Sequence, residues 1–89
     1  MRNILYTRRF SKDLKLAQKR GKDLRKLKQG MTFLAGGDRL PEKLKDHPLR
    51  GYFEDYRECH IEPDWLLLYK ASLSEIYFVR TGTHSDIFG

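Results

Sequence analysis

The segment from Trp65 to Ala71 constrains the fold of this chain more than any other stretch of its sequence. It holds the longest apolar run in the chain, Trp-Leu-Leu-Leu-Tyr at positions 65–69. A continuous run of this length is typical of a strand that is covered on both faces, and it is far too short to cross a membrane as a helix. We therefore expect residues 65–71 to form a buried, central strand.

Further strands are expected before and after this one in the sequence. Residues 2–7 have the pattern of a short strand with Ile4 and Tyr6 on one face, and residues 52–61 alternate loosely. Residues 75–81 alternate between two faces, with Ile76, Phe78 and Arg80 on one and Tyr77 and Val79 on the other. Residues 62–64 and 72–74 are short enough to be hairpin turns, which favours antiparallel pairing.

Two amphipathic helices are expected between the first strand and the others. In residues 8–20 apolar side chains recur at helical spacing, at Phe10, Leu14 and Ala17. In residues 22–35 the same spacing recurs, at Leu24, Leu27, Met31 and Leu34. Thr7 or Ser11 can cap the first helix, and Gly21 ends it, so that one glycine separates the two helices of a hairpin.

The expected order of elements is therefore β-α-α-β-β-β. This order is typical of an α+β domain in which a helical hairpin packs on one face of a mainly antiparallel sheet. Residues 36–51 contain three glycines and two prolines and are expected to be a loop, and residues 82–89 a loop or a single helical turn. With 89 residues, the chain is expected to be a single domain over residues 1–89.

Positive charge is concentrated in the first third of the chain. Residues 1–28 hold 11 Lys and Arg against 2 Asp, a net charge of +9, whereas residues 29–89 hold 7 basic and 10 acidic residues, a net charge of −3. Lys12, Lys15 and Lys19 lie opposite the apolar stripe of the first helix. This basic face predicts a polyanionic partner, most simply nucleic acid. A membrane surface is the alternative, but the apolar stripe is narrow and better used in a core.

The single cysteine, Cys59, excludes an internal disulfide and a zinc site built from several cysteines. It fits a reducing cytoplasm, and the N-terminal residues lack the apolar run of a secretory signal, so we expect a cytoplasmic protein. A mixed site of Cys59, His60, Asp64 and His84 has zinc-type ligands. However, adjacent residues of a strand point to opposite faces, which separates Cys59 from His60. We therefore expect no metal and no cofactor.

Three histidines, His47, His60 and His84, lie outside the basic third, in the loop and at strand ends. Each alone is more often a surface residue or a structural hydrogen-bonding group. Because all three lie at the ends of elements, beside Asp64 and Arg80, they can converge on one pocket, and this set of residues fits metal-free RNA cleavage. That reaction needs groups that take a proton from the 2′-hydroxyl and give one to the departing 5′-oxygen, and a cation that stabilises the phosphorane. The structural alternatives are a turn cap for Asp64 and a rim salt bridge for Arg80.

Three motifs in the second half of the chain occur in a fixed order. They are Lys-Asp-His-Pro-Leu-Arg-Gly at 45–51, Tyr-Arg-Glu-Cys-His-Ile-Glu-Pro-Asp-Trp at 56–65 and Arg-Thr-Gly-Thr-His-Ser-Asp-Ile-Phe-Gly at 80–89. With the helical segment 10–20, they resemble the YafQ branch of the RelE superfamily of bacterial toxins over the whole chain. The resemblance implies a small α+β fold of the microbial-ribonuclease type, in agreement with the order of elements above.

The resemblance also implies a function. Toxins of this type are ribosome-dependent endoribonucleases, or mRNA interferases, which cut the codon in the ribosomal A site without a metal and so inhibit translation. This branch is associated with adenine-rich lysine codons. The implied partners are the ribosome, mRNA and a cognate antitoxin resembling DinJ, which can form a heterotetramer with the toxin and through which alone operator DNA is bound. The alternative is a non-catalytic module of the same fold that binds antitoxin or RNA.

Carried over by position, the catalytic residues of the family match His47, His60, Asp64, Arg80 and His84. We expect His47 and His84 to be the general base and the general acid, in an order that the sequence leaves open. We expect His60 and Asp64 to be a paired proton site or orienting groups, and Arg80 to stabilise the phosphorane.

The resemblance says less about the remaining positions. Phe88 matches the terminal aromatic residue of the family and is expected to pack against a base of the substrate, while Lys12, Lys15 and Lys19 are expected to hold RNA. Trp65 can belong to the core or to the site. Glu58 is a carboxylate where some relatives have Asp, and we assign it no role.

Overall fold

Strands from both ends of the sequence form one mixed sheet in the computed structural model, which describes residues 1–37, 44–49 and 55–89. Across the sheet the order is β1 (Asn3–Tyr6), β5 (Glu75–Gly82), β4 (Trp65–Ala71), β3 (Arg57–Glu62) and β2 (His47–Pro48). β1 pairs with β5 in parallel, and the other pairings are antiparallel. The expected α+β class and the mainly antiparallel sheet are confirmed.

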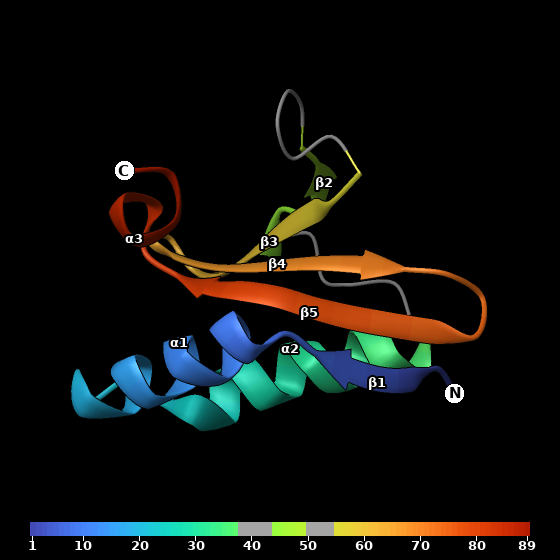
Figure 1. Cartoon of the computed structure of the whole chain (residues 1–89), viewed down its shortest axis with the longest axis horizontal. Coiled ribbons are helices and arrows are strands. Elements are labelled where there is room, and N and C mark those ends of the chain that lie inside the picture. The colour runs from blue at the N-terminus through green and yellow to red at the C-terminus, as the bar shows by residue number, and fades with distance from the viewer. Residues whose placement is uncertain (38–43, 50–54) are drawn as a thin grey trace.

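The helices lie on two sides of this sheet. α1 (Arg8–Lys19) and α2 (Leu24–Gly36) lie on one side, and the short α3 (His84–Phe88) lies on the other side, beyond the end of β5 (Figure 1). The C-terminal segment is thus a single helical turn, one of the two expected forms. Within the described residues, no helix is long and apolar enough to cross a membrane.

The expectation that β4 is a buried central strand is confirmed. All five residues from Trp65 to Tyr69 are buried. They divide between two faces because successive side chains of a strand point in opposite directions. Trp65, Leu67 and Tyr69 join the core beneath the helices, while Leu66 and Leu68 are equally buried but lie outside that cluster. The face away from α1 and α2 therefore has an apolar floor of its own.

Local signals in the sequence set the helix ends. Thr7 is the N-cap of α1, because its side chain accepts a hydrogen bond from the backbone N–H of Phe10. α2 begins at Leu24, two residues later than expected, because Asp23 caps it. Gly21 has a φ of +77°, a left-handed conformation that favours glycine after a helix end.

The apolar stripes of both helices face the sheet as expected. Their buried members are Phe10, Ala17, Leu27 and Leu34, and the other stripe residues, Leu14, Leu24 and Met31, are partly buried against the same core. Gly30 allows α2 to approach β3 closely, since Ile61 Cδ1 lies 2.9 Å from the position that a Cβ on this glycine would take.

The structure corrects the expected loop at residues 36–51. His47 and Pro48 form the short strand β2, which pairs with Glu58 and Arg57 of β3. A two-residue strand is too short to show a period in the sequence, and its proline resembles a loop signal. The expected strand at 52–61 also begins later, at Arg57, and residues 52–54 lie outside the described residues.

A bulge in β5 overturns one expected alternation. Phe78 pairs with Tyr69, but Arg80 pairs with Leu68, so one extra residue, Val79, is inserted in β5. Leu68 and Tyr69 are neighbours on β4 and point to opposite faces. Arg80 therefore lies on the face away from α1 and α2, and not beside Phe78 as the simple alternation predicts.

The environment of Cys59 predicts an unreactive thiol. Cys59 is fully buried in the core, and burial, with smaller contributions from nearby carboxylates, raises its pKa to about 12. Because the thiolate is the reactive form, iodoacetamide at pH 8 is expected to leave the folded protein unmodified and to alkylate it in guanidinium chloride. Mass spectrometry measures this difference, and rapid alkylation of the folded protein would contradict this placement of Cys59.

Candidate active site

A row of side chains crosses the sheet on the face away from α1 and α2. Its members are cross-strand partners on β2, β3, β4 and β5: His47, Glu58, Leu68 and Arg80. His60 pairs with Leu66 in a second row on the same face. Since Leu66 and Leu68 are buried, the polar side chains of β2, β3 and β5 surround an apolar floor.

The three histidines converge over this floor, as the sequence predicts. The ring centroids of His47 and His60 are 6.0 Å apart, and those of His60 and His84 are 5.8 Å apart. His60 therefore lies between the two others. The rings come from three separate segments of the chain, since His47 is on β2, His60 is on β3 and His84 begins α3.

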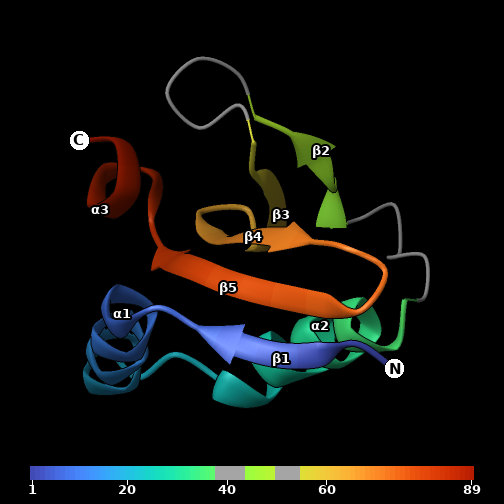
Figure 2. The same ribbon diagram turned by 45° about the vertical axis from the view of Figure 1, so that its right-hand side comes forward.

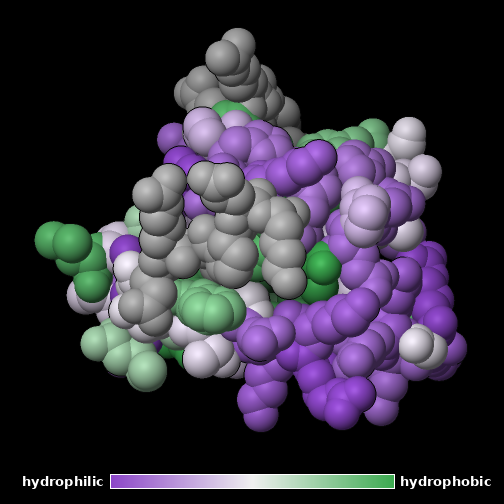
Figure 3. Space-filling model, turned by 180° about the vertical axis from the view of Figure 1, so that it is seen from behind, coloured by the Kyte–Doolittle hydropathy of each residue, from purple (hydrophilic) through white to green (hydrophobic). Residues whose placement is uncertain are grey.

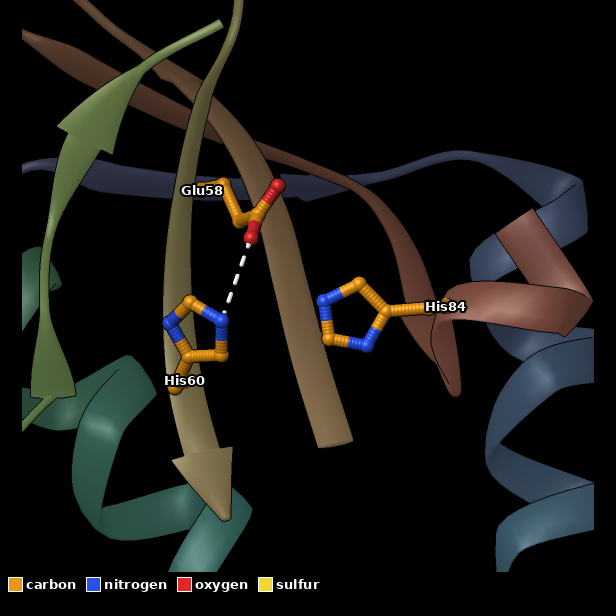
Figure 4. A group of neighbouring side chains, drawn as sticks. All are labelled: Glu58, His60 and His84. Atoms are coloured by element: carbon orange, nitrogen blue, oxygen red, sulfur yellow. Dashed lines mark ion pairs between the residues drawn. The ribbon is translucent and has the colours of Figure 1, made fainter. Parts of the chain in front are cut away.

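The structure adds Glu58, to which the sequence assigned no role, to this group. Its side chain is only 6% exposed, and its Oε1 atom lies 3.4 Å from His60 Nε2 and 3.9 Å from His47 Nε2. Figure 4 shows the Glu58 carboxylate above the His60 ring, with the His84 ring facing them from α3. A buried carboxylate is costly unless it is paired, so Glu58 favours donor groups and positive charge at its neighbours.

Asp64 contacts His84 and not His60, which fits the expected orienting role and not the alternative of a proton site shared with His60. One oxygen of Asp64 accepts a hydrogen bond from the backbone N–H of His84 at 2.9 Å and lies 2.5 Å from His84 Nδ1. These contacts, the backbone bond first, hold the pKa of Asp64 below its ordinary value. His60 and Asp64 do not pair because Asp64 lies in the β3–β4 turn, which reaches α3, while His60 faces Glu58.

Hydrogen-bond partners indicate where each histidine carries its proton. The backbone carbonyl of Lys45 can only accept, so His47 Nδ1 donates to it at 2.7 Å. His84 Nδ1 likewise donates to the Asp64 carboxylate. In the neutral forms of His47 and His84, the Nε2 atoms then carry the lone pairs.

His60 differs from the histidines on either side. Its Nδ1 is buried without a hydrogen-bond partner among the described residues, while its Nε2 faces Glu58. Burial lowers the pKa of His60, more than the Glu58 charge raises it, and so favours the neutral ring. The arrangement assigns the single proton to Nε2, from which it can be donated to Glu58.

The segment that carries His47 is tied to the sheet by Asp46. The Asp46 carboxylate accepts hydrogen bonds from the hydroxyl of Tyr69 and from Nε and Nη2 of Arg57, on β4 and β3. Burial, followed by the bond to Asp46, raises the pKa of Tyr69 above its ordinary value, so this hydroxyl stays protonated. These bonds fix the chain next to His47.

Arg80 fits both roles that the sequence left open, a structural salt bridge and a cation at the candidate site. It makes an ion pair, with Nε 2.8 Å from Asp13 Oδ2 and Nη2 3.4 Å from Asp13 Oδ1. At the same time it lies in the row with Glu58, on the face that carries the histidines. Asp13 is a second functional candidate that the sequence missed, because it lies among basic residues on α1, in a segment to which the resemblance assigned no catalytic residue.

Asp86 anchors α3, which positions His84. With Thr83 it forms a capping box in which each side chain accepts a hydrogen bond from the other residue's backbone N–H. Arg20 of the α1 end holds the same carboxylate through two nitrogens, at 2.6 and 3.1 Å. Gly82 allows this approach, since Asp86 Oδ2 lies 2.9 Å from the position of a Cβ there.

The other predicted site residues lie around the cluster or away from it. Phe88 is 46% exposed at the end of α3, within reach of solvent. Trp65 belongs to the core, where its indole N–H donates to the Thr81 hydroxyl at 2.9 Å. Lys12, Lys15 and Lys19 are exposed on α1, so the structure brings none of them into the core. Seen from behind, hydrophilic residues gather at the lower right of the molecule, at the end where α1 is followed by α2 (Figure 3).

The cluster can also hold a metal ion, although the set differs from the one considered from the sequence. One ligand atom each from Glu58, His60 and His84 lies within 4.8 Å of the others. Imidazole nitrogen and carboxylate oxygen suit zinc and copper. Cys59 points into the core on the opposite face. A metal on this trio would occupy lone pairs that proton transfer needs, so the two uses of the cluster exclude each other.

The anchoring of α3 predicts a pH-dependent stability. The bonds from Arg20, followed by those from Thr83, hold the pKa of Asp86 well below its ordinary value of 3.8. A depressed pKa means that the stabilisation is present above 3.8 and is lost as the pH falls through the folded-state value. Asp86→Asn is therefore expected to lower the free energy of unfolding at pH 7 by about 1 kcal/mol, the scale of a lost helix cap.

Urea denaturation at several pH values measures this effect, and the difference from the wild type is expected to shrink as the solution becomes more acidic. Glu75→Gln, which removes an exposed carboxylate at the other end of β5, is the matched control. A difference that stays constant down to low pH would contradict the Arg20–Asp86 anchor.

Comparisons with known proteins agree with the observed fold. Residues 2–89 match the family model described as "Bacterial toxin of type II toxin-antitoxin system, YafQ". The chain is 52% identical to the mRNA interferase toxin YafQ of Escherichia coli strain K12, over 99% of this chain and 97% of that protein.

Solved structures show the same likeness. The toxin in the crystal structure of the E. coli DinJ–YafQ toxin–antitoxin complex has a TM-score of 0.92 and 52% identity, with 99% of this chain and 98% of that chain covered. A metal-bound toxin from Helicobacter pylori has a TM-score of 0.92 and 42% identity, with 99% and 100% covered. From a family model that spans nearly the whole sequence and relatives of this identity over their full length, it follows that the chain belongs to the YafQ family of mRNA interferase toxins from type II toxin–antitoxin systems.

Proposed function

We propose that this chain cuts mRNA in the ribosomal A site by metal-independent acid–base catalysis. The observation that carries the proposal is the arrangement of His47 and His84. In each of them a hydrogen bond at Nδ1 holds the ring, which leaves Nε2 for proton transfer. They flank the ring of His60 on a face that also carries Arg80. An acid, a base and a cation on one face are the groups that cleavage by a 2′-hydroxyl requires.

In the proposed reaction one of the two flanking histidines takes the proton of the 2′-hydroxyl through Nε2. The 2′-oxygen forms a bond to phosphorus, and the bond from phosphorus to the 5′-oxygen breaks. The other histidine enters as the imidazolium and gives its proton to that 5′-oxygen. The products are a 2′,3′-cyclic phosphate and a free 5′-hydroxyl, so atoms and charge balance without a cofactor.

The neighbouring groups support these proton transfers. Asp64 holds the His84 ring in one orientation, and the Lys45 carbonyl does the same for His47. Glu58 supplies a buried negative charge close to His47 and His60, which offsets positive charge that develops on the rings. Arg80 stabilises the charge on the phosphorane, because a guanidinium matches two phosphate oxygens.

Binding to the ribosome is assigned to the basic face of α1. Lys12, Lys15 and Lys19 project from the helix side of the sheet, whereas the histidines lie on the other face. Docking and chemistry therefore use different surfaces, and Phe88 beside His84 in α3 offers a ring for a base of the substrate. Because the substrate is ribosome-bound mRNA, the proposed place of action is the cytoplasm.

We also propose that an antitoxin neutralises this toxin. A relative with 52% identity is found in a complex with DinJ, and a partner resembling DinJ fits a toxin of this family. The alternative of a non-catalytic binding module is disfavoured, since binding alone does not explain why Glu58 is buried beside histidines or why His47 and His84 are each oriented by a hydrogen bond.

A variant of His84 tests the proposed activity. His84→Ala removes one proton-transfer group, so mRNA on programmed ribosomes is expected to be cut at least about 100-fold more slowly, the lower end of the range for one acid–base group. Ser85→Ala changes the next, exposed residue of α3 and is expected to cut at the wild-type rate. The rate of A-site cleavage is measured by primer extension.

The assay contains a chelator that is selective for transition metals and leaves the Mg²⁺ of the ribosome in place. Cleavage is expected to persist, because the proposed reaction uses no metal. Loss of cleavage with the chelator, or equal cleavage by the His84 variant, would sink the proposed mechanism.

The salt dependence of ribosome binding tests the basic face. Each phosphate contact is expected to contribute about 0.7 to the slope of log affinity against log salt. The triple variant Lys12→Gln/Lys15→Gln/Lys19→Gln is then expected to reduce this slope by roughly 2. Lys70→Gln, on β4, serves as the control and should leave the slope unchanged. An unaltered slope in the triple variant would remove α1 from the docking surface.

A further inference from the structure

A buried carboxylate lies on the otherwise basic helix α1. Asp13 is the only acidic residue of this helix, and it is 7% exposed. Burying a carboxylate is costly unless hydrogen bonds and an opposite charge accompany it. The partners of Asp13 therefore explain why the chain keeps a charged group at this position.

One partner is the backbone of β5. β1 ends at Tyr6, opposite Phe78, so β5 continues toward α3 without a neighbouring strand on that edge (Figure 2). Asp13 Oδ2 accepts the backbone N–H of Thr81 at 3.1 Å in this region. The carboxylate thus replaces a strand that is absent at this end of the sheet.

The second partner is the guanidinium of Arg80. Both oxygens of Asp13 take part, Oδ2 with Nε at 2.8 Å and Oδ1 with Nη2 at 3.4 Å. The backbone carbonyl of Asp86 accepts a further bond from Nη2 at 3.3 Å. Because two nitrogens of a planar group are held, its orientation is fixed. Within the described part of the chain, the hydrogen bonds of Arg80 leave Nη1 unused.

We propose that Asp13 is a positioning residue for RNA cleavage, which holds Arg80 so that Nη1 is directed to the scissile phosphate. The inference rests on the proposed function and deepens it. Stabilisation of a transition state depends on donors that are already oriented when charge develops. A long arginine side chain is flexible, and the bulge at Val79 only brings it to the correct face of the sheet. The two bonds from Arg80 to the Asp13 carboxylate, here called the fork, supply the orientation that the strand does not.

The competing explanation is that Asp13 merely stabilises the fold through Thr81. Asp13→Asn separates the two roles, because the amide of Asn keeps one oxygen that can accept the Thr81 N–H. Its other group is an NH₂, which donates and cannot accept a bond from Arg80. That one oxygen can keep the bonds from the Thr81 N–H and from Arg80 Nε, while the bond from Nη2 and the negative charge of the carboxylate are lost. The guanidinium is then no longer held at two points.

The test compares four proteins on programmed ribosomes: wild type, Asp13→Asn, Arg80→Ala and the double variant. Asp13→Asn is expected to lower the rate of cleavage roughly 10- to 100-fold, the scale of a misplaced catalytic group. Arg80→Ala is expected to be at least as slow. If Asp13 acts through Arg80, the double variant is no slower than Arg80→Ala alone, which a purely structural role would not produce. Glu75→Gln is the control for the loss of one negative charge.

Each outcome decides the inference. Wild-type cleavage by Asp13→Asn overturns it, and so does a double variant in which the two losses multiply. A wild-type protein that does not cut mRNA refutes the proposed function instead, before the variants are compared.

Arg80→Lys covers the case in which Asp13→Asn does not fold. Lysine keeps the positive charge beside Asp13 but cannot form the fork. We expect it to be as slow as Arg80→Ala, and cleavage at the wild-type rate overturns the inference. Circular dichroism of each variant shows whether the fold is intact.

Discussion

β4 is apolar on both of its faces, and this requirement organises the rest of the molecule. Trp65, Leu67 and Tyr69 need a cover on one face, which α1 and α2 supply. Leu66 and Leu68 are buried on the other face, where no long helix covers them within the described residues. Side chains of the neighbouring strands and of α3 surround them instead, and these are the histidines, Glu58 and Arg80. The candidate site therefore forms part of the burial of the central strand.

Polar groups over an apolar floor have unusual electrostatics. Glu58 is a buried negative charge, and His60 is held toward its neutral form by burial. Each of the flanking histidines, His47 and His84, is held by a hydrogen bond at Nδ1, which leaves Nε2 for proton transfer. The same arrangement suits a transition metal, because a hydrogen bond that orients a ring for proton transfer also orients it as a metal ligand. The basic face of α1 lies on the helix side of the sheet and can hold a polyanion without disturbing these groups.

The helices and the central strand could be predicted because their signals are local. The spacing of Phe10 and Ala17 follows the helical period, and Thr7 caps the helix whatever surrounds it. The convergence of the histidines could be predicted from their place at element ends and from the resemblance of the motifs around them. Glu58 and Asp13 could not, since each is an ordinary charged residue in its own segment. Their burial depends on β4 and β5, which come later in the chain.

The sequence by itself determined the class of fold, the family and the histidines of the candidate site, because periodicity, caps and ordered motifs are properties of contiguous residues. Only the tertiary structure decided how these groups are paired. The bulge at Val79 moves Arg80 to the face of the histidines, the β3–β4 turn brings Asp64 to His84, and the end of β1 leaves a backbone N–H that Asp13 accepts. Register, turns and strand ends are fixed by packing between distant segments, and no spacing within one segment encodes them.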